Sequence, residues 1–445
     1  MLLEARCPTM PMSPDGYEMS TAADVLSGSS GRFVELTGWI ARKHTVGGLV
    51  FALLRDGSGY LQVSFRKGNQ DSGVFASARA MTIESAILVK GEVRDDPRAP
   101  GGKEVSARSL EVVSRAESWP ITKTAAKSAS YLFDKRHLSI RGPKAIATMR
   151  IRAEVVGAAF DYFRGNGFQL ISAPTFVQAA VEGGSTLFSV DYFGKKVSLS
   201  QSAQFYEEAA LPALKKVWIF QPAFRAEKSK TPKHLTEFWM IESEQAFADQ
   251  SDNLRVQEEL LSTMVSRVIE NRSAELKTLG RELKQLNIPF PRMTYDEARE
   301  TAAKKGFPFV WGDDLPVEAE RAVSLTQESP FFITDYPLSA RSFYHMTFPN
   351  RPDVTKSADL IAPEGYGELA TGGQRIHDHR ELVARIEKQD LPAESFQWYL
   401  ELRRFGMPPH SGFGIGVERT TRWVAGLRHI RSASLFPRTL SRISP

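Results

Sequence analysis

Residues 224–242, FRAEKSKTPKHLTEFWMIE, decide the fold class of this chain. Arg225 and Glu227 lie two residues apart in a strand-like segment, so their side chains point to one face. A basic turn, KSKTPKH, follows, and EFWMIESE then returns as a second strand with Glu242 and Glu244 on a common face. An arginine and a carboxylate on a sheet floor, under a basic hairpin, are suited to binding a triphosphate. Taken alone, the stretch fits a surface hairpin with ion pairs somewhat better.

A glycine-rich stretch nearer the carboxyl end, residues 411–424 (SGFGIGVERTTRWV), predicts a strand that runs into a helix. Glycines in a strand let a ligand or a neighbouring strand approach the backbone closely. Arg419 falls at the predicted junction, where it could meet a phosphate or stack on a base. A packing strand with a surface arginine explains the same residues equally well.

Three carboxylates lie in a third stretch, residues 356–376 (KSADLIAPEGYGELATGGQRI). Asp359, Glu364 and Glu368 supply the oxygen ligands that Mg²⁺ prefers. Carboxylates in loops are more often simply solvated, so these residues alone do not favour a metal site.

Length and composition set wide bounds on the rest of the chain. The 445 residues allow two or three domains, and 42% hydrophobic with 24% charged residues is typical of a globular protein with a core. The net charge of +5 permits a nucleic-acid partner without requiring one. No apolar run of about 18 residues predicts a membrane span, and no secretory signal pattern opens the chain. The single cysteine, Cys7, excludes an internal disulfide and fits a reducing cytoplasm.

The first part of the chain predicts a small β-barrel. After an irregular segment at 1–30, residues 31–116 contain short β-type runs such as FVELTGWIA and YLQVSFRK, separated by turn residues. About five antiparallel strands without a long intervening helix suggest an OB-fold, although a structural barrel fits the composition as well. Residues 117–142 form a polar, basic linker.

Residues 143–445 predict an α+β domain, an antiparallel sheet flanked by helices. The runs KVWIFQPAF, FWMIESEQAF and PFFITDYP are strand-like, and hairpins separate them more often than helices do. A helical pattern at about residues 252–285 predicts a packing or insertion helix pair. No GxxxxGK[ST] or GxGxxG loop occurs, so a nucleotide site would be built in another way.

The three stretches resemble, in their order along the chain, motif 2, the metal-binding strand and motif 3 of class II aminoacyl-tRNA synthetases. GFQLISAPTF, which contains Pro174, resembles motif 1, the dimer-interface element. The similarity runs from about Phe33 to Pro437 and is specific, because four separated motifs follow an OB-like domain in the right order. It points to the subgroup of aspartyl, asparaginyl and lysyl enzymes. It implies an aminoacyl-tRNA ligase that uses ATP and Mg²⁺, forms a homodimer through motif 1 and works in the cytoplasm.

The resemblance also assigns the ATP site. Arg225 would hold the α-phosphate and Glu227 would read the adenine amine, while Arg419 would stack on adenine and reach the γ-phosphate. The other nucleotide-binding positions would be His234, Leu235, Phe238, Leu369 and Gly416. Catalysis by such a site is positional and electrostatic, without a covalent enzyme nucleophile.

Glu368, Thr371 and Asp359 would form the magnesium site, and Glu368 would join the two arginines as a catalytic residue. In family members the aspartate often lies a couple of residues nearer the glutamate than Asp359 does. The magnesium ion and the arginines would neutralise the charge that develops when the amino acid's carboxylate attacks the α-phosphorus.

The same resemblance assigns the amino-acid pocket, with Glu182 and Gln204 at the α-ammonium group and Arg375 at the side chain. The full set of implied positions is Glu182, Ser202, Gln204, Glu242, Thr371 and Arg375.

Two departures from the aspartyl pattern favour asparagine. Aspartyl enzymes usually carry a lysine three residues after QSPQ, whereas QSAQ here is followed at that distance by Glu207; motif 2 ends in Glu242 in place of an aspartate. An anion in place of a cation disfavours a second carboxylate, while a carboxamide can donate to Glu242. GGQRIHD and DYPLSARSFYHM are closer to archaeal-type aspartyl enzymes. The sequence thus predicts L-asparagine and tRNA(Asn), with an aspartate–tRNA ligase, including one that charges both tRNAs, as the alternative.

The OB-like region gains a role from the resemblance. Phe51, Gln62 and Glu104 match the positions that stack on and hydrogen-bond the central anticodon uridine. Without the resemblance, Phe51 would be expected in the core.

Two further alternatives differ in class. An asparagine synthetase related to these enzymes would lack the anticodon domain that this chain contains. A non-catalytic RNA-binding relative should have lost Arg225, Glu368 or Arg419, and all three are present.

Overall fold

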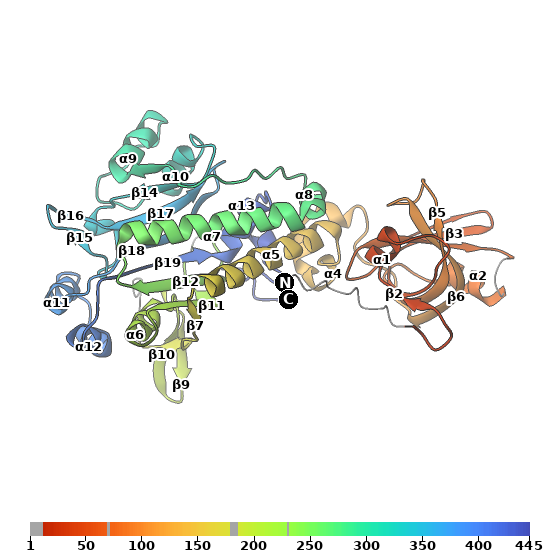
Figure 1. The fold of residues 1–445 in the computed structure, drawn as a ribbon, viewed down its shortest axis with the longest axis horizontal. Helices are drawn as coiled ribbons and strands as arrows, with labels where there is room; N and C mark the ends of the chain where they lie inside the picture. Colours follow the sequence, from red (N-terminus) through yellow and green to blue (C-terminus); the bar gives the residue numbers. More distant parts are fainter. Residues whose placement is uncertain (1–11, 69–71, 179–185, 229–230) are drawn as a thin grey trace, which may run out of the picture. The chain divides into compact units, whose positions relative to one another are not determined.

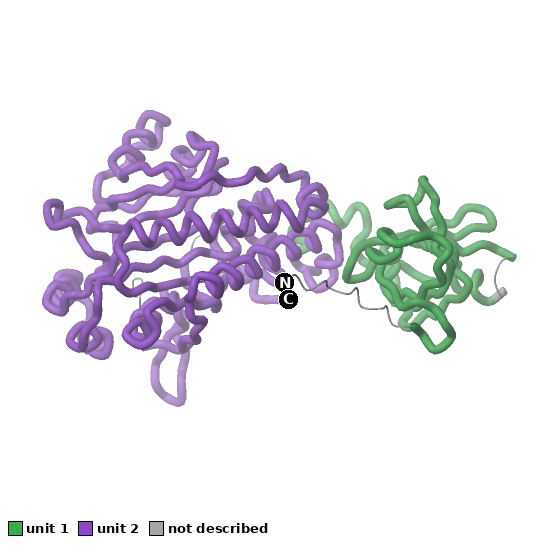
Figure 2. The backbone as a smooth tube through the Cα atoms, viewed as in Figure 1, with its two compact units in different colours: residues 1–132 green, residues 133–445 purple. Residues whose placement is uncertain are grey.

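The structure, a computed structural model, describes residues 12–68, 72–178, 186–228 and 231–445. The chain divides into two compact units, Met1–Leu132 and Phe133–Pro445 (Figure 2). The division falls inside the polar segment 117–142.

The first unit is built on five long strands. They are β2 (Phe33–Val46), β3 (Leu49–Arg55), β4 (Tyr60–Arg66), β5 (Ala86–Asp95) and β6 (Lys103–Ser114). β2 pairs antiparallel with both β3 and β5, β3 pairs with β4, and β5 pairs with β6. β4 and β6 pair in parallel, which the sequence did not predict, because the chain crosses over through a helix and β5 before β6 returns beside β4.

Short elements complete this unit. β1 (Glu18–Met19) pairs with β2, α1 (Ala22–Ser27) begins at a capping box on Thr21, and α2 (Ser72–Ala80) lies between β4 and β5 in sequence. Alternating residues of the strands, such as Val34 and Leu36 of β2, are buried in the interior. The period-2 pattern of FVELTGWIA thus reflects one interior and one outward face.

The second unit contains an eight-stranded sheet (Figure 1). In spatial order its strands are β13 (Arg292–Thr294), β14 (Phe331–Thr334), β17 (Ser357–Ala362), β18 (Gly367–Gln374), β19 (His410–Gly416), β12 (Glu237–Ala246), β11 (Lys216–Phe224) and β7 (Gln169–Leu170). All central pairings are antiparallel, and only the edge pairs β13–β14 and β7–β11 are parallel among the pairings of this sheet's described strands. The predicted antiparallel sheet is confirmed.

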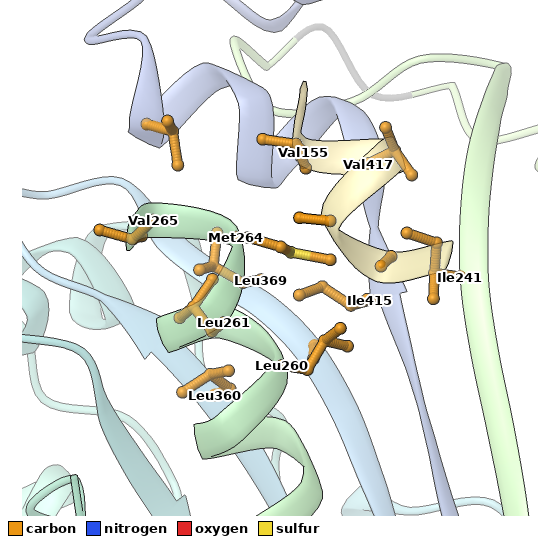
Figure 3. Packing of buried hydrophobic residues seen from close by; sticks show 14 of the residues in the cluster. Val155, Ile241, Leu260, Leu261, Met264, Val265, Leu360, Leu369, Ile415 and Val417 are labelled. Carbon is orange, nitrogen blue, oxygen red and sulfur yellow. The ribbon is translucent and has the colours of Figure 1, made fainter. Parts of the chain in front are cut away.

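Two long helices, α5 (Pro143–Gly165) and α7 (Gln250–Asn271), lie side by side along this unit (Figure 1). α7 packs on β17, β18 and β19, and Figure 3 shows its Leu260 and Met264 among side chains from the sheet and from α5. α7 and the following α8 (Ser273–Leu279) cover the segment in which a packing or insertion helix pair was expected. α7 forms a layer of the central core.

The remaining elements surround the sheet. The helices are α3 (Ala129–Asp134), α4 (Arg136–Ser139), α6 (Gln204–Leu214), α9 (Tyr295–Lys304), α10 (Val317–Ser324), α11 (His379–Lys388), α12 (Gln397–Arg404) and α13 (Val417–Val424). Two small sheets consist of β8 (Phe176–Val177), β9 (Ser189–Tyr192) and β10 (Lys195–Leu199), and of β15 (Thr347–Phe348) and β16 (Arg351–Thr355). In the described part of the chain, every helix is too short or too polar to cross a lipid bilayer.

Candidate active site

A cavity of about 270 Å³ opens on the sheet of the second unit. Ile241 of β12 and Ile415 of β19 point into the core beneath α5 and α7. Because side chains alternate along a strand, their neighbours Glu242, Gly414 and Gly416 face the other way and line the cavity. The cavity therefore lies on the sheet face opposite to the two long helices.

The strand register aligns residues from four strands across the cavity floor. Asp359 lies opposite Thr371, Thr371 opposite Gly414, and Gly414 opposite Glu242. These paired residues are 12, 43 and 172 positions apart along the chain, and antiparallel pairing places them in one row. This row joins the predicted metal-binding strand, motif 3 and motif 2.

Glycines of β19 make room for the carboxylates of β12. A Cβ atom at Gly412 would overlap the carboxyl group of Glu244, and one at Gly414 would lie 3.2 Å from the Oε1 atom of Glu242. The glycines of β19 therefore allow close packing against β12 and also leave space for the carboxyl groups that line the cavity. The sequence had left open whether this strand packs or borders a site, and it does both.

The structure gathers nearly all the predicted residues of this unit on the cavity wall. They are Ser202, Gln204, Arg225, Glu227, His234, Leu235, Phe238, Glu242, Glu368, Leu369, Thr371, Arg375, Gly416 and Arg419. Asp359 does not line the cavity, but it accepts hydrogen bonds from two residues that do: Thr371 Oγ1 at 2.8 Å and Arg341 Nη2 at 2.6 Å. Glu182 lies outside the described residues.

Motif 2 supplies a flat aromatic surface beside a guanidinium group. The carbon at the centre of the Arg225 guanidinium lies 5.6 Å from the centroid of the Phe238 ring, and its Nη1 lies 4.0 Å from Glu227 Oε1. Arg225 N–H donates to Thr236 O and so extends the β11–β12 ladder beyond the end of β11. This arrangement can receive a base on the ring and a phosphate at the arginine.

Arg419, at the start of α13, faces Glu368 of β18. Its Nη1 donates to Glu368 Oε1 at 2.5 Å. Burial acts to raise the pKa of Glu368, but Arg419, with Lys233 and Arg225, outweighs it and lowers that pKa to about 2. Glu368 is therefore an ionised carboxylate in a strongly positive surrounding, which suits a site for polyanionic phosphates and a divalent cation.

The donor set for a magnesium ion is small. Thr371 Oγ1 lies 3.3 Å from Glu368 Oε1, and the carboxylate of Asp359 accepts from Arg341 Nη2 at 2.6 Å. The described residues contain no cluster of three acidic, histidine or cysteine side chains that could hold a metal alone. The residues fit an ion that takes one protein carboxylate and obtains its other oxygens from phosphates and water, as Mg²⁺ commonly does. Asp359 is held by Arg341, so Glu368 is the better-placed ligand.

His234 follows the basic turn and lines the same end of the cavity. Its Nδ1 lies 2.6 Å from Thr231 Oγ1, and its Nε2 lies 3.8 Å from Glu227 Oε2. Burial, together with Arg419, lowers the pKa of His234 to about 4, so the imidazole is neutral near pH 7.

The other end of the cavity is dominated by buried carboxyl groups. Arg375 Nη2 donates to Glu244 Oε1 at 2.6 Å, and its Nε donates to the same atom at 3.0 Å. Glu242 Oε2 accepts from the backbone N–H of Ala203 at 2.6 Å. Both carboxyl groups belong to β12, as the alternation in EFWMIESE predicts.

Glu207 of α6 lies between these groups and is only 1% exposed. Burial raises the pKa of Glu207 well above its usual value, Glu242 and Glu244 add to the shift, and Arg375 opposes it. Its Oε1 has no hydrogen-bond partner among the described residues. This environment shifts Glu207 toward its protonated form, which weakens the repelling negative charge that the sequence had suggested. In either form, no cation stands where the aspartyl pattern has a lysine.

Gln204 is held by a second buried group of side chains. Its Nε2 donates to Glu208 Oε1 at 3.0 Å, and Glu208 also accepts from Arg403, Tyr399 and His410. The amide nitrogen of Gln204 is thereby turned to Glu208, which leaves its carbonyl oxygen for the cavity.

The cavity also contains residues that the sequence did not single out as site residues. They include Lys233, Glu244, Asp314, Arg341, Tyr344 and His345. Lys233 lies in the basic turn KSKTPKH and Arg341 lies in the run DYPLSARSFYHM. Both stretches were identified in the sequence, but no role was assigned to these two residues. Asp314 lies in the connection between α9 and α10, where no local pattern indicates a site.

The first unit brings the three predicted anticodon positions onto neighbouring strands. Gln62 and Glu104 are register partners on β4 and β6, and Gln62 Nε2 donates to Glu104 Oε2 at 2.9 Å. Phe51 of β3 lies opposite Ser64, whose hydroxyl donates to Glu104 Oε1 at 2.8 Å. The three side chains therefore share one face, and Phe51 is half-buried there.

Comparison with known proteins places this geometry in a family. Residues 128–440 match the family of "tRNA synthetases class II (D, K and N)", and residues 34–113 match the "OB-fold nucleic acid binding domain". The asparagine–tRNA ligase of Thermococcus gammatolerans is 44% identical over 95% of this chain and 98% of its own length. That of Chloroflexus aurantiacus is 46% identical over 93% of this chain and 96% of its own.

Solved structures agree with the sequence relatives. The asparaginyl-tRNA synthetase from Pyrococcus horikoshii, complexed with asparaginyl-adenylate, is similar with a TM-score of 0.93 and 42% identity, covering 96% of this chain and 100% of that chain. The enzyme from Entamoeba histolytica in complex with asparaginyl-adenylate has a TM-score of 0.87 and 29% identity, covering 96% and 99%.

Proposed function

Because the chain belongs to the class II tRNA synthetases of the aspartyl, lysyl and asparaginyl group, we propose that it is an asparagine–tRNA ligase. It activates L-asparagine with ATP to asparaginyl-adenylate and diphosphate, and transfers the asparaginyl group to the 3′ end of tRNA(Asn). One observation carries the proposal: a single cavity joins Arg225, Glu368 and Arg419 to a pocket of buried carboxyl groups.

At the nucleotide end, the residues act by position and charge. The adenine ring lies on Phe238 with its amine at Glu227, and Arg225 meets the α-phosphate and the attacking carboxylate. Arg419 covers the other face of the ring and reaches the γ-phosphate, and neutral His234 can donate one hydrogen bond to a phosphate oxygen. Negative charge that grows on the α-phosphate is neutralised by fixed guanidinium groups, which is where such a site lowers the barrier.

Glu368, with Thr371 beside it, would hold the magnesium ion that accompanies ATP. The ion, when bound, supplies positive charge to the phosphates of the leaving diphosphate. Arg419 Nη1 donates to the Glu368 carboxylate, so this carboxylate would be shared between the guanidinium group and the ion.

The amino-acid end distinguishes a carboxamide from a carboxylate. Gln204 turns its carbonyl oxygen to the α-ammonium group, and Glu242 accepts an N–H of the carboxamide. Arg375 is already paired with Glu244, so little positive charge is left for the carboxylate of aspartate. A buried site whose polar groups are matched by one substrate and left unpaired by another can discriminate by about 10⁴-fold.

The tRNA is proposed to be read by the first unit, where Phe51 stacks on an anticodon base and Gln62 and Glu104 provide its hydrogen-bond partners. The homodimer is proposed to form through the motif 1 segment, where Leu170 and Phe176 are about half exposed and available for burial. The reaction is placed in the cytoplasm, where tRNA is charged for translation.

The proposal is tested by ATP–diphosphate exchange, which needs no tRNA. Exchange should depend on asparagine, and aspartate at the same concentration should give only background. If both amino acids stimulated exchange equally, the chain would be a synthetase of relaxed or aspartate specificity and the proposed amino acid would be wrong.

A further inference from the structure

A carboxylate from outside the four motifs lies behind the ATP end of the cavity, in contact with Lys233 and Glu368, which line it. Glu320 belongs to α10, in a segment for which the sequence predicted no role, and is 6% exposed. Its Oε1 accepts from the backbone N–H of Glu368 at 2.9 Å, and its Oε2 accepts from Lys233 Nζ at 2.6 Å. One side chain therefore holds the proposed magnesium ligand's backbone and a cation of motif 2 together.

Gly367 makes this contact possible. Its φ is +82°, a conformation that favours glycine, and a Cβ atom there would overlap the Oε1 atom of Glu320. Only a glycine at position 367 therefore leaves room for the Glu320 carboxylate beside the backbone N–H of Glu368.

Lys233 is the other partner of Glu320. It lines the cavity next to His234, and its charge is among those that lower the pKa of Glu368. Without this partner the lysine side chain could take several rotamers, and ordering it on nucleotide binding would cost conformational entropy. The Glu320 carboxylate keeps Lys233 in one arrangement before any nucleotide arrives.

We propose that Glu320 is a positioning residue for ATP with its magnesium ion, because it fixes Lys233 and the backbone of Glu368 in one arrangement. Glu320 itself is not among the residues that line the cavity. The inference rests on the proposed function for the identity of the nucleotide, and it adds α10 to the parts of the chain that build the site.

Direct binding of ATP with Mg²⁺, measured by calorimetry without asparagine or tRNA, tests this role. Glu320→Gln keeps the size of the side chain and an acceptor for the Glu368 amide but removes the charge that holds Lys233, and Glu320→Ala removes both. We expect Kd to rise about tenfold for Glu320→Gln, the loss typical of one charge-assisted hydrogen bond, and further for Glu320→Ala. The matched control Glu318→Gln, on the exposed face of α10, should leave Kd unchanged.

Exchange kinetics separate positioning from general stability. The KM for ATP should rise in both Glu320 variants while the KM for asparagine stays within about twofold, because Glu207, Glu242 and Arg375 lie at the other end of the cavity. If Glu320 acts through Lys233, Glu320→Gln should add little to the effect of Lys233→Met in the double variant.

Three outcomes would overturn the inference. They are an unchanged ATP affinity in Glu320→Gln, an equal rise of both KM values, and fully additive effects with Lys233→Met. Absence of asparagine-dependent exchange in the unaltered chain would instead remove the proposed function, while the binding measurement with ATP alone would still decide the role of Glu320.

Discussion

At the scale of single residues, Glu207 is proposed to help determine which amino acid the cavity accepts. The sequence showed that an acid replaces the lysine of the aspartyl pattern, and it suggested repulsion between two carboxylates. The structure buries this acid beside two others, and the resulting rise of its pKa favours the protonated form. In the proposed pocket, discrimination between asparagine and aspartate depends on the absence of a lysine at position 207, on the pairing of Arg375 with Glu244 and on Glu242 as a hydrogen-bond acceptor.

Two substitutions at position 207 test this account. Glu207→Gln keeps a neutral side chain of the same size with a donor, so kcat/KM for asparagine in exchange should fall by less than about tenfold. Glu207→Lys places a cation near Arg375, so asparagine activation should fall by about 100-fold or more and the preference over aspartate should narrow. Two outcomes would contradict this account. A severe loss of asparagine activation in Glu207→Gln would show that the pocket needs an ionised carboxylate at this position. Full activity in Glu207→Lys would show that the pocket tolerates a cation there.

At the scale of elements, the packing of β19 against β12 requires glycines. Gly412 lies under the carboxyl group of Glu244, which binds Arg375. Gly412→Ala should therefore displace Glu244 and strain the strand, lowering the free energy of unfolding by about 1–3 kcal/mol and weakening asparagine binding.

Gly157→Ala is the matched control. Gly157 lies inside α5 with open space at its Cβ position, and alanine there should raise the free energy of unfolding by about 0.5–1 kcal/mol. Chemical denaturation measures the free energy of unfolding of both variants. Equal values for Gly412→Ala and Gly157→Ala would contradict the crowding that the structure shows at Gly412.

Elements also show what the sequence could and could not predict. Motifs 2 and 3 lie at the end of β11, on β12, on β19 and at the start of α13, elements that local patterns in the sequence indicate; the structure brings residues from these motifs to one cavity. Glu320 and Asp314 were missed because only tertiary folding returns the α9–α10 segment to β18. The parallel pairing of β4 with β6 was missed because a period-2 pattern indicates a strand and does not name its partner. The resemblance placed Asp359 at the metal, and its contact with Arg341, 18 residues earlier in the chain, was not predicted because no local pattern links the two.

At the scale of the whole molecule, the chain is an OB-fold unit followed by a class II synthetase unit, as the sequence predicted. Activation and tRNA reading should therefore be separable. Phe51→Ala should leave exchange unchanged and lower kcat/KM for tRNA charging by about 5- to 150-fold, the worth of one stacked base. Arg225→Ala should abolish both reactions, since transfer needs the adenylate.

Phe33→Ala serves as the control for Phe51→Ala. Phe33 is 41% exposed at the opposite end of β2 from His44, the residue that pairs with Phe51. Charging should not change in this variant. Loss of exchange in Phe51→Ala, or an equal loss of charging in Phe33→Ala, would make the role of Phe51 structural.

The most direct test of the central claim is the identity of the amino acid that the chain attaches to tRNA. The purified chain is incubated with ATP, Mg²⁺, a tRNA(Asn) transcript and equal amounts of isotopically distinct asparagine and aspartate, and the 3′-terminal aminoacyl-adenosine is identified by mass spectrometry. The account predicts asparaginyl-adenosine alone. Aspartyl-adenosine in comparable amount would contradict it.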